Sequence, residues 1–312
     1  MRDEKVKKMT AKKNIFSDIL KNYNLYLMIL PVFAGFVVFK YFPMYGIILA
    51  FKDYDIVKGI WDSEWVGFKW FIYFFQDPYF GRLIRNTILL GLYGLIFGYW
   101  PPILLALLLN EVRHNKFKKT VQSISYLPHF IATVVIVGMM IEIFGTFGVV
   151  NNILETLGIG RISFLSDAKY FRSLYIGSEI WQGVGWSSIL YIATLSGIDQ
   201  ELYLAASVDG AGRFRKAIHI SIPGLVPTIR ITLIFAISGI ISVGFEKAYL
   251  LQNPATYETS DVIATYVYRM GIQQMNFSYG TAIGLFEGVI SLMMLMLANY
   301  VVKKISGGEG LW

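Results

Sequence analysis

The chain has 312 residues, of which 55% are hydrophobic and 16% are charged, with no cysteine and a formal net charge of +7. Soluble domains carry about a quarter charged residues, so this composition excludes an ordinary soluble globular protein. The lack of cysteine excludes a disulfide framework and thiolate metal sites. The basic net charge does not indicate nucleic-acid binding, because the cations cluster at the ends of apolar runs, as in integral membrane proteins.

The N-terminal residues 1–22 carry seven cations and three acids, which indicates a basic cytoplasmic segment. The apolar run that follows, at about 25–51, is long enough to cross a bilayer, which takes about 20 residues. A signal peptide would have a shorter apolar core that ends at a small-residue cleavage site. We therefore expect a retained first transmembrane helix.

Five further apolar runs predict five more membrane spans. They lie at about 83–109, 124–144, 171–195, 225–251 and 279–302. The sequence therefore predicts an all-α membrane protein with six transmembrane helices in a multi-pass domain that covers residues 23–304. Residues 305–312 are expected to form a C-terminal tail.

The distribution of Lys and Arg predicts the orientation of these spans. The segments expected on one side, namely the two termini, 113–119 and 213–216, hold 16 of these cations. The segments expected on the other side, namely 52–82, 145–170 and 252–277, hold 7 over many more residues. Because cytoplasmic loops carry the excess of cations, both termini are expected in the cytoplasm. The exoplasmic segment 52–82 then carries Trp61, Trp65 and Trp70. These rings favour an interfacial position over the alternative, a sugar-binding role.

Residues 198–222 form a polar, cation-rich loop between two apolar runs. The order of a short helix, a glycine turn, a basic helix and then a membrane span predicts an element that docks on a partner protein. Asp199 is a plausible N-cap for a short helix with one apolar face. Gly210 and Gly212 then permit a sharp turn, and residues 213–220 are expected to form a second, basic helix. Pro223 suits the first turn of the next span. The alternative is an amphipathic loop that lies on the bilayer surface.

The residues 203–223, YLAASVDGAGRFRKAIHISIP, resemble the cytoplasmic EAA loop of permease subunits of ATP-binding-cassette importers. The matching positions are Ala205, Ala206, Asp209, Gly210, Ala211, Ile220 and Pro223. Leu204 departs from the usual Glu and Ala217 from a common aromatic residue, and Glu201, one turn earlier, is a candidate source of the missing carboxylate. The flanking segments GSEIWQGVGWSSILYIATL and SVGFEKAYLLQNP resemble permeases that import oligosaccharides.

The resemblance implies a type I ABC importer permease fold in the bacterial cytoplasmic membrane and import of an oligosaccharide or a polysaccharide-derived glycan. The implied partners are two ATPase subunits, a second permease subunit that is a paralogue or an identical copy, an extracellular solute-binding protein and the lipid bilayer. ATP and Mg would be used by the ATPase, and this chain would bind no cofactor. The residues that would couple the loop to the ATPase are Glu201, Ala205, Ala206, Asp209, Gly210, Ala211, Gly212 and Pro223.

Sequence motifs of enzymes are missing. The chain contains no Gly-Lys dipeptide, so a phosphate-binding loop of the form G-x-x-x-x-G-K-[ST] is impossible. His114, His129 and His219 lack the spacing of metal ligands, and no acids or bases pair as a catalytic site would require. The chain is therefore expected to be neither the ATPase nor a membrane-bound glycan enzyme. A stand-alone secondary transporter or channel is the main alternative, although no inverted repeat supports it.

Polar residues inside the predicted spans are candidates for the substrate path, because charge in a membrane is costly and usually faces an aqueous cavity. The fourth and fifth spans flank the docking loop and combine aromatic and polar side chains, a combination that suits a sugar. The predicted path residues are Trp181, Gln182, Trp186, Ser242 and Glu246. Other ionisable residues in apolar sequence are Glu142, Glu179, Lys247 and Glu287. Helix-to-helix packing is the alternative role for the aromatic residues.

Overall fold

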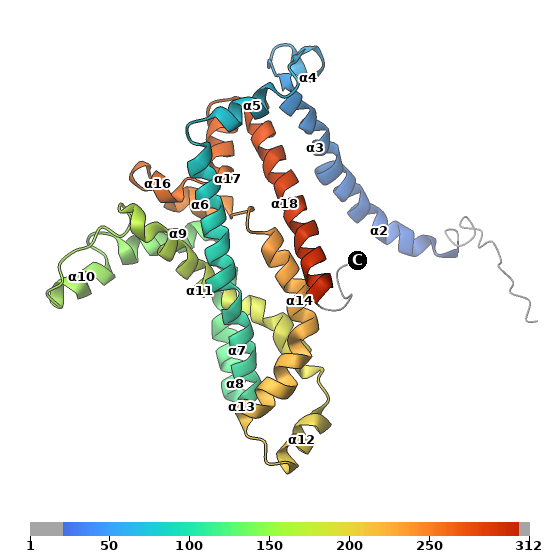
Figure 1. The fold of residues 1–312 in the computed structure, drawn as a ribbon, viewed down its shortest axis with the longest axis vertical. Coiled ribbons are helices and arrows are strands. Elements are labelled where there is room, and N and C mark those ends of the chain that lie inside the picture. Colours follow the sequence, from blue (N-terminus) through green and yellow to red (C-terminus); the bar gives the residue numbers. More distant parts are fainter. Residues whose placement is uncertain (1–20, 306–312) are drawn as a thin grey trace, which may run out of the picture. The chain divides into compact units, whose positions relative to one another are not determined.

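The computed structural model describes residues 21–305, and most of these residues are helical (Figure 1). The chain divides into two units, residues 1–49 and residues 50–312, which are described separately. The predicted N-terminal segment 1–22 and C-terminal tail 305–312 lie almost entirely outside the described residues. The all-α prediction is confirmed for the described part of the chain, apart from one short pair of strands.

The first unit is an apolar helical stretch. It comprises α2 (Tyr23–Phe36), η1 (Val37–Tyr41), α3 (Phe42–Met44) and the start of η2 (Tyr45–Phe51). Together, Tyr23–Phe51 form one of five described helical stretches that are long and apolar enough to cross a membrane. This stretch coincides with the first predicted span, 25–51.

The second unit begins with a small hairpin that precedes the bundle. β1 (Lys52–Asp53) pairs antiparallel with β2 (Glu64–Trp65), with α4 (Gly59–Asp62) between them, and α5 (Lys69–Gln76) follows. The indole nitrogen of Trp70 donates to the carbonyl oxygen of Lys52 at 3.0 Å, so this ring stabilises the hairpin. Trp61 and Trp65, in contrast, are exposed.

The second predicted span is confirmed as a long apolar helical stretch, Phe80–Glu111. It consists of α6 (Phe80–Tyr93), η3 (Gly94–Gly98) and α7 (Trp100–Glu111). The π-helical η3 lies just before Pro101 and Pro102 and interrupts the regular hydrogen-bond pattern where a kink is expected.

The third predicted span, 124–144, is wrong as a single helix. The structure has α8 (Asn115–Tyr126), a 3-10 turn η4 (Leu127–Phe130) and then α9 (Thr133–Phe144). Pro128 lies in this turn, and Ile131 and Ala132 separate the two helices. The loop predicted at 145–170 also contains a helix, α10 (Val149–Thr156). We call residues 145–167, between α9 and α11, the α10 lobe. The buried amide of Asn151 stabilises it by donating hydrogen bonds to the carbonyl oxygens of Gly145 (2.8 Å) and Ile162 (2.9 Å).

The helix α11 (Ala168–Ser196) is the central element of the second unit and contains the fourth predicted span. Its 29 residues correspond to about 43 Å at 1.5 Å per residue, enough to cross a bilayer. It is more polar than the five apolar stretches and is not among them. Its N-terminal part packs in a core with α6 and α9, and its C-terminal part packs in another with α7 and α14.

The fifth predicted span, 225–251, is wrong at both ends. The helix already begins at the basic segment, as α13 (Arg213–Lys216), η5 (Ala217–Ser221) and α14 (Ile222–Ser238). Pro223 lies in the first turn of α14, as predicted, where a residue without an N–H is tolerated, although the helical stretch itself already begins at Arg213. Residues 239–244 are not helical, and the chain resumes as α15 (Phe245–Leu251).

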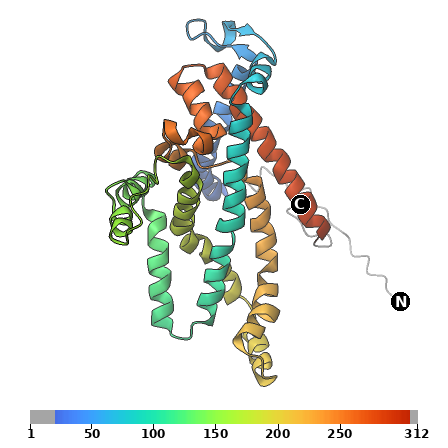
Figure 2. The same ribbon diagram turned by 60° about the vertical axis from the view of Figure 1, so that its left-hand side comes forward.

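The predicted outer loop 252–277 is largely helical. It contains η6 (Pro254–Thr256), α16 (Tyr257–Ser260), α17 (Ile263–Val267) and η7 (Tyr268–Gln273). The last helix, α18 (Phe277–Ile305), contains the sixth predicted span, 279–302. Within the second unit, α5 and α17 lie at one end and α12 (Gln200–Val208) lies at the opposite end (Figures 1 and 2).

Candidate functional site

The loop 198–222 folds into two helices joined by a tight turn. Asp199 caps α12, because its side chain accepts a hydrogen bond from the backbone N–H of Glu201 at 2.9 Å. Gly210 ends the helix with φ of +73°, a left-handed conformation that only glycine adopts without strain. The N–H of Ala211 donates back to the carbonyl oxygen of Ala206 at 2.8 Å, which completes the helix cap. The predicted sharp turn at Gly210 is therefore confirmed.

Side chains tie the two helices of this loop to each other. The ammonium group of Lys216 donates to the hydroxyl of Ser207 at 2.6 Å. The hydroxyls of Tyr203 and Ser221 share a hydrogen bond of 2.9 Å. Since α13 runs on through η5 into α14, these two side-chain contacts tie α12 across the turn at 209–212 to a long apolar helix.

The exposed surface of this element combines large apolar side chains with charged ones, such as Arg213 and Arg215, and has no partner among the described residues. Val208 is 88% exposed and Phe214 80% exposed, and Leu202 and Leu204 are also exposed. Of the predicted coupling residues, Glu201, Ala205, Asp209, Gly210, Gly212 and Pro223 are exposed, and Ala206 and Ala211 are partly buried. We define the exposed surface of α12 and α13 as the coupling surface. The large apolar side chains gathered on it are typical of a surface that another protein covers.

A cavity of about 660 Å³ lies in the helical bundle between α6, α7, α11 and α14. The non-helical residues 239–244 also line it, including Ser242. The break packs tightly against α6: a Cβ atom on Gly91 would lie 2.0 Å from the carbonyl oxygen of Ile240. Non-helical backbone at membrane depth is tolerated where it is buried in protein or lines a cavity.

The predicted path residues do not all face this cavity. Trp186 and Ser242 line it, and the ring of Trp186 stacks on His129 with centroids 4.5 Å apart. Trp181 lines a separate hollow of about 280 Å³ beside α9, so the two tryptophans do not form one wall. Glu246 is exposed in the first turn of α15 and lines neither space.

Gln182 belongs to a polar cluster that sequence reasoning did not assemble. Its side-chain nitrogen donates to the carbonyl oxygen of Ile131 at 3.2 Å, and its oxygen accepts from Lys247 at 2.9 Å. The ammonium of Lys247 also lies 2.5 Å from a carboxylate oxygen of Glu179. Each charged residue is visible in the sequence, but their pairing is not, because α11 and α15 meet only in the tertiary structure.

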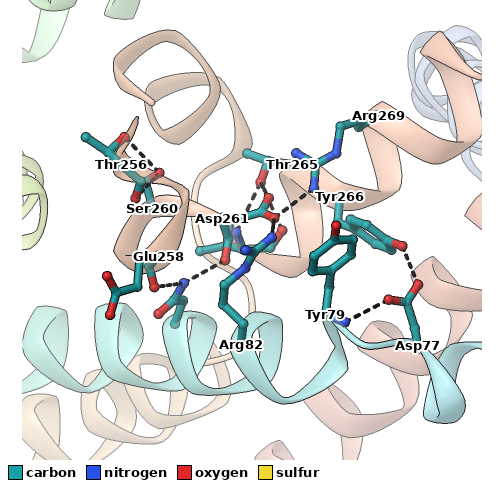
Figure 3. A network of polar contacts seen from close by, with 12 residues as sticks. Asp77, Tyr79, Arg82, Thr256, Glu258, Ser260, Asp261, Thr265, Tyr266 and Arg269 are labelled. Carbon is teal, nitrogen blue, oxygen red and sulfur yellow. Dashed lines mark hydrogen bonds and ion pairs between the residues drawn. The ribbon is translucent and has the colours of Figure 1, made fainter. Parts of the chain in front are cut away.

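A second cluster at the opposite end from α12 was also missed (Figure 3). Asp261 is fully buried, and its carboxylate accepts from Arg82 of α6 at 2.9 Å and from Arg269 of η7 at 2.7 Å. The amide of Asn86 reinforces the contact by donating to the carbonyl oxygens of Asp261 (3.1 Å) and Glu258 (3.0 Å). These bonds fasten the segment 257–273 to the start of α6.

The carboxylate of Asp77 extends this network to α18. It accepts hydrogen bonds from the hydroxyl of Tyr266 (Figure 3) and from that of Tyr279, the latter at 2.8 Å. Burial raises the pKa of Tyr266 above its ordinary value, and the bond to Asp77 adds to the shift, so this hydroxyl remains a donor throughout the physiological range. Asp77, which precedes α6, is thereby connected to both α17 and α18.

Among residues 21–305, no group of three or more His, Cys, Asp or Glu side chains is suited to a metal ion. The described polar clusters consist of ion pairs and hydrogen bonds between side chains and backbone groups. They connect helices, and one member, Glu179, lines the cavity.

Comparisons with known proteins match nearly the whole chain. A family model described as "Binding-protein-dependent transport system inner membrane component" matches residues 102–307. Protein LplB of Bacillus subtilis is 43% identical over 97% of this chain and 96% of its own length. The Polygalacturonan/rhamnogalacturonan transport system permease protein YteP of the same organism is 42% identical over 99% of this chain and 97% of its own length.

Solved structures are similar as well. A chain in the crystal structure of a bacterial ABC transporter involved in the import of the acidic polysaccharide alginate is 41% identical, with a TM-score of 0.86, and the match covers 93% of this chain and 99% of that one. A chain of the bacterial alginate transporter in complex with an alginate pentasaccharide-bound periplasmic protein has the same identity and TM-score, over 95% of this chain and 99% of that one.

Proposed function

Because this chain belongs to the family of binding-protein-dependent transport system inner membrane components, the permeases of ABC importers, we propose that it carries a glycan across the bacterial cytoplasmic membrane. The resemblance seen in residues 203–223 is confirmed by this membership. The observation that carries the proposal is the combination of a rigid coupling surface at one end of the second unit with a bundle cavity of about 660 Å³.

The coupling surface supports docking to a separate ATPase. Its exposed apolar side chains, such as Val208 and Phe214, would be covered by a groove of the ATPase. Since the loop continues into α14, closure of an ATPase pair would move that helix as a rigid body and switch the bundle between inward-open and outward-open states. In this proposal the ATPase binds ATP and Mg, and two ATPase subunits and a second permease subunit complete the transporter.

The substrate class follows from the cavity and from the relatives. Trp186 offers an aromatic face, and Ser242 and the backbone of residues 239–244 offer hydrogen-bonding groups, as a sugar requires. The relatives are named for transport of polygalacturonan, rhamnogalacturonan or alginate. We therefore propose an oligosaccharide derived from a polysaccharide, delivered by an extracellular solute-binding protein.

The proposed topology has six spans with both termini in the cytoplasm, counting α11 together with the five apolar stretches. It places exposed Lys116 inside and exposed Asp62 outside. The natural chain has no cysteine, so Lys116→Cys and Asp62→Cys each introduce a single thiol. A membrane-impermeant maleimide added to intact cells should label Asp62→Cys, and should label Lys116→Cys only after the cells are permeabilised. Labelling of Lys116→Cys in intact cells would contradict the orientation.

The position of Trp186 gives a prediction for the substrate path. Trp186→Ala should slow ATP-dependent uptake of the glycan about fivefold, because an aromatic stacking contact contributes roughly 1 kcal/mol. Trp186→Phe keeps an aromatic face and should lose less. The measurement is uptake into proteoliposomes that contain equal amounts of assembled transporter. Equal uptake by the wild type and Trp186→Ala would assign this ring to helix packing.

A further inference from the structure

The cavity wall contains a charged residue that nothing above assigns to the substrate. Among the described residues that line the cavity, Glu179 is the one charged side chain. It lies about 17 Å along α11 from the start of the helix, at membrane depth, and is nevertheless 49% exposed. A carboxylate in such a position is costly, so it usually faces a water-filled path and has a partner.

Lys247 is that partner, and its own position is unusual. The Lys247 side chain is only 4% exposed, and its ammonium group contacts Glu179 at 2.5 Å and Gln182 at 2.9 Å. Gln182 is in turn fixed by the carbonyl oxygen of Ile131. The cation is therefore held behind the cavity wall, where it neutralises the charge of Glu179 and fixes one of its two carboxylate oxygens.

We propose that Glu179 is a substrate-contact residue, whose free carboxylate oxygen accepts hydrogen bonds from glycan hydroxyls, and that Lys247 is its positioning residue. This inference rests on the proposed glycan import. A carboxylate can accept two or more hydrogen bonds, so one oxygen can remain on Lys247 while the other meets adjacent hydroxyls of one sugar ring. Hydrogen bonds to an ionised acceptor are the strong ones, so this contact would dominate over those of neutral groups in the cavity.

The position in the fold supports a contact that changes during transport. Lys247 lies on α15, directly after the non-helical residues 239–244, whereas Glu179 lies on α11. Part of the break, including Ser242 and Gly244, lines the same cavity as Glu179. A movement of α14 relative to α11 would be transmitted to Glu179 through this segment. The contact between Glu179 and a bound sugar would therefore change between the inward-open and outward-open states.

The experiment compares Glu179→Gln with the double variant Glu179→Gln/Lys247→Met, both assembled with the natural partner subunits. The double variant removes both charges and leaves no unpaired ion in the bundle. If Glu179 contacts the glycan, both variants should transport roughly tenfold more slowly per assembled complex, and the double variant should assemble fully. If Glu179 and Lys247 only neutralise each other's charge in the bundle, the double variant should regain wild-type uptake, and that result would overturn the proposal.

A second readout tests the chemistry directly. O-methylation blocks the hydroxyl donors of a glycan, so wild-type uptake should fall when an O-methylated oligosaccharide replaces the unmodified one. The ratio of the uptake rates for the unmodified and the O-methylated oligosaccharide should be several-fold smaller in the double variant than in the wild type. An equal ratio in both would contradict the proposed hydrogen bond between Glu179 and the glycan. Glu142→Gln is the matched control, since Glu142 is exposed on α9 and lines neither cavity. Failure of the wild-type complex to import any glycan would instead overturn the proposed function.

Discussion

Gly210→Pro is expected to abolish substrate-stimulated ATP hydrolysis while the protein stays in the membrane. Gly210 has φ of +73°, whereas proline requires φ near −65°, so the turn cannot form with proline. The substitution also removes the N–H that donates to the carbonyl oxygen of Ser207 at 3.1 Å. The coupling surface would then lose its shape, although the long apolar helices need none of these bonds. Asp209→Lys, which reverses the charge beside the turn, should have the same effect on coupling.

Gly158→Pro is the matched control for this variant. Gly158 also has a positive φ, of +76°, and its N–H donates to the carbonyl oxygen of Glu155 at 2.9 Å. It lies in the α10 lobe and not in the loop 198–222, so this variant should keep coupled hydrolysis. The measurement is the ATPase activity of reconstituted transporter with and without substrate-loaded binding protein. Normal stimulation in Gly210→Pro would remove the docking role from the coupling surface.

Asp261→Asn is expected to destabilise the protein by about 3 kcal/mol, because it leaves two arginines without their carboxylate in a largely buried place. Asp261 itself is 0% exposed, and the side chains of Arg82 and Arg269 are 27% and 21% exposed. The segment 257–273 would lose its attachment to α6. The midpoint of thermal unfolding, measured on the assembled transporter in detergent, should fall by several degrees.

The ion pair of Asp53 and Lys69 provides the control for burial. Its N–O distance of 2.7 Å equals that of Asp261 and Arg269, but its side chains are 46% and 51% exposed. Exposed ion pairs contribute about 0–1 kcal/mol, so Asp53→Asn should hardly change the midpoint. Equal shifts in Asp53→Asn and Asp261→Asn would show that burial of the Asp261 cluster contributes nothing to stability.

The sequence by itself determined the class of the protein and the place of its coupling loop. Apolar runs of about 20 residues must form helices in a membrane, because every backbone polar group there needs a partner within its own segment. The first, second and sixth runs appear as long apolar helical stretches for this reason. The turn at Gly210 was also readable, since few residues other than glycine adopt its backbone conformation.

Only the tertiary structure decided where the helices break and which polar residues meet. Hydropathy cannot distinguish the end of a helix at Ser238 from its continuation, because the break at 239–244 is also apolar and is stabilised by packing against α6. The partners in the ion pair of Glu179 and Lys247 lie far apart in sequence, as do Arg82 and Asp261. Such pairs depend on how distant helices pack, and local sequence patterns carry no information about that packing.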